Sequence, residues 1–133
     1  MGLLESLRIS GSALTAQRLR LDVIASNLAN LETTRTPEGG PYRRQKVVFA
    51  PWVPPGAGGV GVQVPAVLSE GRFRRVYDPE HPDADPDGFV TMPDINLVTE
   101  VTDLLSAVRA YEANVAALNA LRQMAQRALD LGR

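Results

Sequence analysis

The segment LVTEVTDLLSAVRAYEANVAALNALRQMAQRALDL, residues 97–131, decides the fold class that this sequence predicts. Apolar residues recur along it at alternating intervals of three and four positions, the pattern of one buried helix face. It contains neither Gly nor Pro, and Pro93 and Asp94 precede it as start signals. A helix of about 35 residues is about 50 Å long, so one face needs a partner outside a small core. The predicted contact residues are Val101, Leu104, Val108, Tyr111, Asn114, Val115 and Leu118.

The N-terminal segment carries a second heptad pattern. Leu7, Leu14, Leu21 and Leu28 recur every seven residues, and no proline interrupts them. This spacing is typical of a helix that packs along another helix. We therefore expect the four leucines, here called the leucine seam, to form an interface.

Two asparagines accompany the end of this pattern. Asn27 and Asn30 lie three positions apart, so they share one helix face and flank Leu28. Two interpretations stay open: both amides are solvated near a helix end, or they form hydrogen bonds that fix the register of an interface. We favour the second interpretation, with Asn114 and Asn119 as the opposite polar partners.

Residues that break regular structure separate the two helical segments. All ten prolines and eight of the eleven glycines lie between Thr36 and Asp94. Alternating apolar residues predict short strands over residues 42–49, 59–68 and 72–77. The fold predicted here is therefore mainly α, with two long terminal helices packed as an antiparallel coiled coil. Its helical domain would comprise residues 1–34 and 95–133, and residues 35–94 would form a small β and irregular segment.

Composition excludes several classes of function. The 14 basic and 15 acidic residues nearly cancel, which argues against a nucleic-acid partner. Without cysteine there are no disulfides, thiolate metal sites or cysteine nucleophiles. We find no signal-peptide pattern and no apolar run long enough for direct membrane insertion.

The Asp-rich turn at residues 78–88 is the strongest candidate for a metal-binding site in this sequence. Asp83, Asp85, Asp87 and Asp94 are spaced like ligands of a calcium loop. However, Pro86 interrupts the loop and no helix can precede it, so side chains that hold their own turn are the favoured explanation. We expect no cofactor, no small-molecule substrate and no enzymatic activity. The alternative function is a calcium-binding or free-standing coiled-coil adaptor.

A family resemblance joins the two ends of the chain. The stretch SGSALTAQRLRLDVIASNLANLETT, with Tyr42 and Arg43 after it, resembles the N-terminal motif of the bacterial flagellar axial proteins. VRAYEANVAALN, residues 108–119, resembles their C-terminal signature, and the segment from Asp78 to Asn114 is similar to the proximal-rod members in particular. The chain has Leu31 and Glu32 at the two positions before the threonines of the N-terminal motif, where the family usually has Ala and Asn.

This resemblance implies a structural subunit of the flagellar proximal rod, the periplasmic drive-shaft that transmits torque. Its terminal helices would pack against other copies and other rod proteins to form the inner core of a tube, while the middle segment faces outward. Such proteins leave the cytoplasm through the flagellar type III export apparatus without a cleaved signal peptide. Phe49 and Val53 have the spacing associated with docking on that apparatus, although an ordinary strand end explains them equally well.

Overall fold

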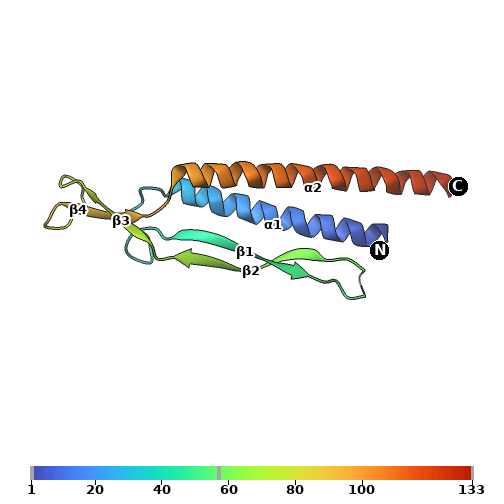
Figure 1. Cartoon of the computed structure of the whole chain (residues 1–133), viewed down its shortest axis with the longest axis horizontal. Helices are drawn as coiled ribbons and strands as arrows, with labels where there is room; N and C mark the ends of the chain where they lie inside the picture. The colour runs from blue at the N-terminus through green and yellow to red at the C-terminus, as the bar shows by residue number, and fades with distance from the viewer. Residues whose placement is uncertain (1, 57, 133) are drawn as a thin grey trace.

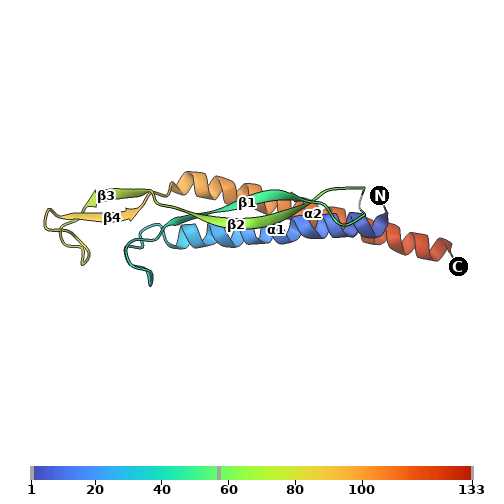
Figure 2. The same cartoon turned by 90° about the horizontal axis from the view of Figure 1, so that it is seen from below.

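The computed structural model describes residues 2–56 and 58–132 as an elongated molecule with two long helices and two β-hairpins. Helix α1 (Leu3–Ala29) and helix α2 (Leu97–Leu131) lie side by side and run antiparallel (Figure 1). Strands β1 (Arg44–Trp52) and β2 (Gly61–Glu70) form a hairpin along the side of α1 that faces away from α2. Strands β3 (Phe73–Tyr77) and β4 (Phe89–Pro93) form a second hairpin that projects beyond the helices (Figure 2).

The helix ends follow local sequence signals. Asn96 caps α2, because its side-chain oxygen accepts a hydrogen bond from the N–H of Thr99 at 3.1 Å. Asn30 ends α1: its Nδ2 donates to the backbone oxygen of Ser26 at 2.8 Å, and its Oδ1 accepts from Thr33 at 3.0 Å. Neither helix, within the part of the chain that is described, combines the length and apolar character of a bilayer span.

Both strands of the β1–β2 hairpin begin two residues later than the sequence predicted, β1 at Arg44 and β2 at Gly61. The antiparallel register of the hairpin pairs Val47 with Val67, and an irregularity lies between Val48 and Ala50. At its far end Gly61 packs closely on α1, where the N–H of Val62 donates to Ser12 Oγ at 3.1 Å. Ala57, inside the connection between the strands, lies outside the described residues.

The β3–β4 hairpin is a separate two-stranded sheet. The rings of Tyr77 and Phe89 meet edge to face at 5.4 Å, and Arg75 lies over the Phe89 ring. Gly88 has φ +85°, and a Cβ there would lie 2.9 Å from the Tyr77 ring, so the turn requires glycine. Val90, which pairs with Val76 next to the connecting loop, is fully buried.

The prediction of a mainly α coiled coil is wrong. Of the described residues, 48% are helical and 22% lie in strands, so the fold mixes α and β structure. The physical reason is that α1 has two neighbours, α2 on one side and the β1–β2 hairpin on another. Its buried residues are consequently Ala16, Val23, Ile24 and Asn27, whereas the leucine seam is half-buried.

Candidate assembly interface

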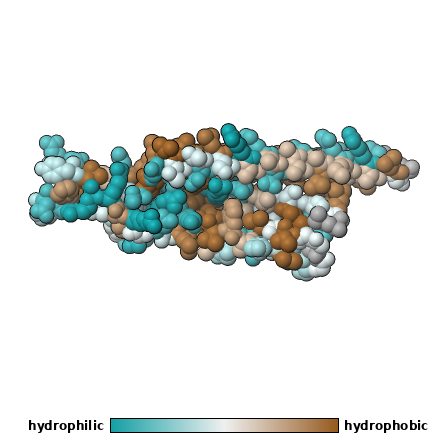
Figure 3. Space-filling model, viewed as in Figure 1, coloured by the Kyte–Doolittle hydropathy of each residue, from teal (hydrophilic) through white to brown (hydrophobic). Residues whose placement is uncertain are grey.

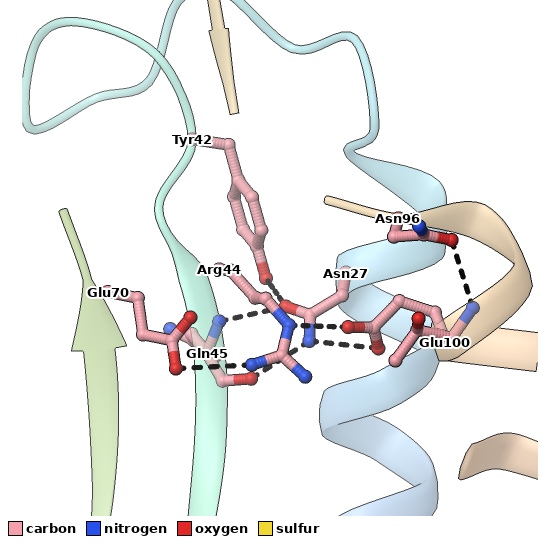
Figure 4. A network of polar contacts seen from close by, with 8 residues as sticks. Asn27, Tyr42, Arg44, Gln45, Glu70, Asn96 and Glu100 are labelled. Atoms are coloured by element: carbon pink, nitrogen blue, oxygen red, sulfur yellow. Dashed lines mark hydrogen bonds and ion pairs between the residues drawn. The ribbon is translucent and has the colours of Figure 1, made fainter. Parts of the chain in front are cut away.

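The buried amide of Asn27 joins α1 to β1. Its Nδ2 donates to the backbone oxygen of Gln45 at 2.8 Å, and the Gln45 N–H donates back to Oδ1 at 2.9 Å (Figure 4). The hydroxyl of Tyr42 donates to the same Oδ1 at 2.9 Å, and Nδ2 also donates to Glu100 at 3.4 Å. The two donor and two acceptor positions of the amide are all used, in a side chain that is 1% exposed.

Glu100 is a buried carboxylate in the first turn of α2. Nε of Arg44 donates to its Oε1, and the same guanidinium lies 3.3 Å from the carboxylate of Glu70 on β2. Burial alone would lower the pKa of Arg44, but the hydrogen bond to Glu100 and the charges of Glu100 and Glu70 raise it overall. The negative charge of Glu100 also interacts favourably with the positive end of the α2 dipole, because Glu100 lies in the first turn of that helix.

These residues form a polar junction, defined as Asn27, Tyr42, Arg44, Gln45, Glu70 and Glu100. It connects α1, α2, β1 and β2 at one point (Figure 4). Among the described residues, no buried side-chain nitrogen or oxygen lacks a hydrogen-bond partner. Any other register of the two helices would leave the Asn27 amide or the Glu100 carboxylate unpaired in a buried place, which is costly.

The structure assigns the predicted asparagines other partners. Asn27 bonds to α2 through Glu100, not through Asn114 or Asn119. Asn114 donates to the backbone oxygen of Ala110 in its own helix, and Asn119 is exposed. Asn30 holds the end of α1, as described above.

The sequence reasoning missed the charged part of the junction. Glu100 lies four residues before Leu104 and seven before Ala107, on the same face as the predicted contacts. A charge on the apolar face of a helix, which requires a partner once buried, was a usable signal. No local sequence pattern identifies Arg44 as the partner of Glu100, because the two residues are distant in sequence.

The predicted interface residues lie along the helix pair and are incompletely covered. All four leucines of the seam are half-buried, as are Leu104, Val108, Tyr111, Asn114, Val115 and Leu118 on α2. Val101 is 39% exposed, and the buried residues of α2 are Glu100 and Ala107. Both helices therefore keep apolar surface that this chain alone does not cover.

The residues of the predicted export motif are accessible. Phe49 in β1 is 40% exposed, and Val53, directly after that strand, is 62% exposed. Neither belongs to the buried core, so both side chains are free to contact another protein.

The acidic residues of the Asp-rich turn bind neighbouring segments. Asp83 accepts hydrogen bonds from Thr34 and Arg35, both at 2.6 Å, and Thr34 above all lowers the pKa of Asp83. Asp85 accepts from the N–H of Phe89 at 2.8 Å and from Arg75, and these contacts lower its pKa.

The other two candidate ligands, Asp87 and Asp94, are exposed. Within residues 2–56 and 58–132, no three acidic or histidine side chains are grouped as metal ligands. The turn thus uses its carboxylates to attach itself to residues 34–35 and to β3.

Family comparisons match both ends of the chain. The family model described as flagella basal body rod protein matches residues 7–35. The model described as flagellar basal body rod FlgEFG protein C-terminal matches residues 87–131. Together the two matches cover more than half of the chain and include all of α2 and most of α1.

Similar proteins match over almost their whole length. The flagellar basal-body rod protein FlgC of Escherichia coli O6:H1 is 46% identical over 99% of both chains. The protein of the same name from Borreliella burgdorferi is 44% identical over 98% of both chains. That of Bacillus subtilis is 41% identical, over 96% of this chain and 97% of the relative.

Proposed function

The chain belongs to the FlgC family of flagellar basal-body rod proteins, and from that membership we propose that it is a subunit of the proximal rod. Its role is that of a structural subunit of the basal-body rod. In this proposal, copies of the chain and other rod proteins assemble helically in the periplasm, where the rod transmits torque.

The incompletely covered helix pair is the observation that supports this proposal. The leucine seam on α1 and the exposed Val101 on α2 leave apolar surface available to neighbouring subunits. The helical residues 1–34 and 95–133 would form the inner core of the rod, and residues 35–94 would face outward. The position of the β1–β2 hairpin, on the side of α1 away from α2, supports this division.

A purely structural role, without catalysis, completes the proposal. The buried ionisable group Glu100 is already paired with Arg44, and its contacts connect backbone elements. Asp83 and Asp85 likewise hold a turn in place. These side chains stabilise the fold by joining its segments to one another.

Export through the flagellar type III apparatus would bring the subunit to the periplasm without a cleaved signal peptide. The accessible Phe49 and Val53 support a docking role at the export gate. Phe49→Ser with Val53→Ser should then reduce secretion while the cytoplasmic amount stays normal. Val67→Ser, an exposed apolar position on β2, is the matched control.

Complementation tests the function itself. In cells whose own copy is deleted, this chain should restore swimming and be recovered in isolated basal bodies. Val108→Asp should abolish both, because it places a charge in an apolar contact, whereas Arg109→Asp at the exposed neighbouring position should not. Thermal unfolding of both purified variants separates lost assembly from lost folding. Swimming restored without the chain in basal bodies would contradict a structural role.

A further inference from the structure

Strand β2 is paired along only one of its edges. Among the described residues its sheet contains two strands, and β2 is the outer one (Figure 1). Residues 65–69 are all exposed, including Val67 at 41% and Leu68 at 52%, and Figure 3 shows hydrophobic surface over this hairpin. Residues 66–69 carry no charge that would discourage pairing with another chain. The edge of β2 after Pro65 can therefore accept a further strand.

The backbone groups at this edge of β2 point away from β1. Gln45 uses both its N–H and its C=O for Asn27, so the paired residues Gln45 and Ser69 exchange no backbone hydrogen bonds. Hydrogen-bonded and non-bonded pairs alternate along an antiparallel ladder. The N–H and C=O groups of Val67 and Ser69 therefore face outward, where a neighbouring strand can bind them.

Strand β3 has a second unpaired edge. The N–H of Asp94 donates to the backbone oxygen of Arg72 at 3.1 Å, directly before the β3–β4 ladder begins. The same alternation then turns the backbone groups of Phe73, Arg75 and Tyr77 away from β4. These three residues are exposed. Strand β3 continues beyond the end of β2 in the same direction, so the two edges cannot pair within one chain (Figures 1 and 2).

The charges on the two strands favour pairing of β2 with β3 over pairing of like strands. Strand β3 contains Arg74 and Arg75 and no acidic residue, whereas β2 contains Glu70 and no basic residue. Two copies of β3 side by side would place arginines opposite each other, which is destabilising. Glu70 lies 3.3 Å from Arg44, and a carboxylate has lone pairs for a second donor. The lengths also agree, because five residues of β2 follow Pro65 and β3 has five residues.

We propose that the β2 edge of one copy pairs with the β3 edge of a second copy, so that the outer segments join into one sheet. Two different surfaces of the chain meet in this contact, which is heterologous and extends through an open array. The inference rests on the function proposed above, because a rod is such an array. It adds which outer surfaces of the subunit meet.

The direction and register of the pairing follow from the same geometry. Copies in a helical array point the same way, and β2 and β3 run in the same direction, so the joined strands are parallel. A residue in a parallel pair bonds to the two residues that flank its opposite. Arg75 then lies opposite Leu68 and bonds to Val67 and Ser69, and its guanidinium is within reach of Glu70 on the same face. Side chains still project from the two faces of the joined sheet.

Proline at an outward position tests the backbone contact. Val67→Pro removes one outward N–H, and an edge strand tolerates proline where the missing donor faces solvent. The amount of chain in isolated basal bodies should fall at least about tenfold, because every contact between copies loses a hydrogen bond. Val67→Ala shortens the same side chain, keeps the N–H and should keep the wild-type amount. Thermal unfolding of both purified variants checks that each is folded. Equal incorporation of the two variants would overturn the inference.

Disulfide crosslinking identifies the partner, because the chain has no cysteine of its own. Leu68 and Arg75 lie about 23 Å apart along two strands that follow each other, and a disulfide requires Cα atoms within about 7 Å. A bond between Leu68→Cys and Arg75→Cys must therefore join two copies. This double variant should give a ladder of dimers and higher oligomers after oxidation of basal bodies isolated from swimming cells.

The matched control is Leu68→Cys with Thr91→Cys. Thr91 is exposed and pairs directly with Arg75, but it lies on β4, one strand farther from the proposed contact by about 4.8 Å. The control should stay monomeric. Monomers alone from the Arg75 pair, or an equal ladder from the control, would overturn the inference.

The single variants examine pairing between like strands. Dimers from Leu68→Cys alone would show that β2 pairs with a second β2, and dimers from Arg75→Cys alone would show that two β3 strands pair. Either result would overturn the inference. Absence of the unaltered chain from basal bodies would instead contradict the proposed function.

Discussion

Asn27 pairs with Gln45 through two hydrogen bonds, so its side-chain amide binds the N–H and the C=O of one strand residue in the way that a neighbouring strand would. Among the described residues, no backbone–backbone hydrogen bond joins α1 to β1, so this side chain provides the link. The same amide accepts a hydrogen bond from the hydroxyl of Tyr42 and donates one to Glu100 on α2. It therefore connects the hairpin to both helices.

Asn27→Leu should destabilise the fold by about 3 kcal/mol, because two backbone groups of Gln45 lose their buried partners. An asparagine that only fixed the register of an interface would make the same substitution neutral or stabilising for helix association. Urea unfolding followed through Trp52 measures the effect. Asn119→Leu, at an exposed position of α2, should change the unfolding free energy by less than about 0.5 kcal/mol. Equal effects of the two substitutions would contradict the role of the junction.

Arg44 and Glu100 should be strongly coupled. Arg44→Met alone leaves the buried Glu100 carboxylate without its cation, which should cost about 3 kcal/mol of stability. Replacing both residues by Met removes both charges and should cost clearly less than the sum of the single substitutions. A double-mutant cycle in urea measures this difference. Additive effects would mean that the two charges act independently.

Gly61→Ala should separate the hairpin from α1. The added Cβ would lie 2.6 Å from Ser12 Oγ and 2.8 Å from the Trp52 ring, so the hairpin must move. Overpacking of this kind typically costs about 1–3 kcal/mol. Gly71→Ala is the control, since its Cβ would meet only the flexible end of Arg43 at 3.4 Å. Thermal unfolding that is unchanged by Gly61→Ala would rule out close packing at this point.

Acid should weaken the attachment of the Asp-rich turn. The pKa of Asp85 is lowered by the Phe89 N–H and by Arg75, so its stabilising contribution is complete above its ordinary value of 3.8 and is lost as pH falls through the lower folded value. Asp85→Asn should therefore have a lower thermal midpoint than the wild type at pH 7. The difference between the thermal midpoints of the wild type and the variant should narrow below about pH 4. A gap that is constant with pH would show that the charge of Asp85 is unimportant.

The sequence predicted the helices well because their limits depend on local signals. Proline and glycine are concentrated between Thr36 and Asp94, and α2 begins at Leu97 after an Asn96 cap. The face that each helix buries depends on its neighbours. Val23 and Ile24 are buried, and Leu21 is only half-buried, because the hairpin shares α1 with α2.

The polar junction was less predictable for a different reason. Half of the contacts of Asn27 involve backbone groups of Gln45, and backbone groups carry no sequence signature. The Arg44–Glu100 pair joins distant segments, so it depends on a fold that heptad periodicity alone does not specify. The family motif contains both Asn27 and Tyr42, although it does not indicate that the two side chains are in contact.

Cysteine labelling in assembled rods tests most directly whether the helix pair forms the interior and the middle segment the exterior. Val101→Cys on α2 and Arg74→Cys on β3 both occupy exposed positions of the single chain and should react equally fast as purified subunits. In detergent-extracted rods, Arg74→Cys should still react with maleimide, and Val101→Cys should be protected. Comparable labelling of both positions in the rod would contradict the proposed arrangement.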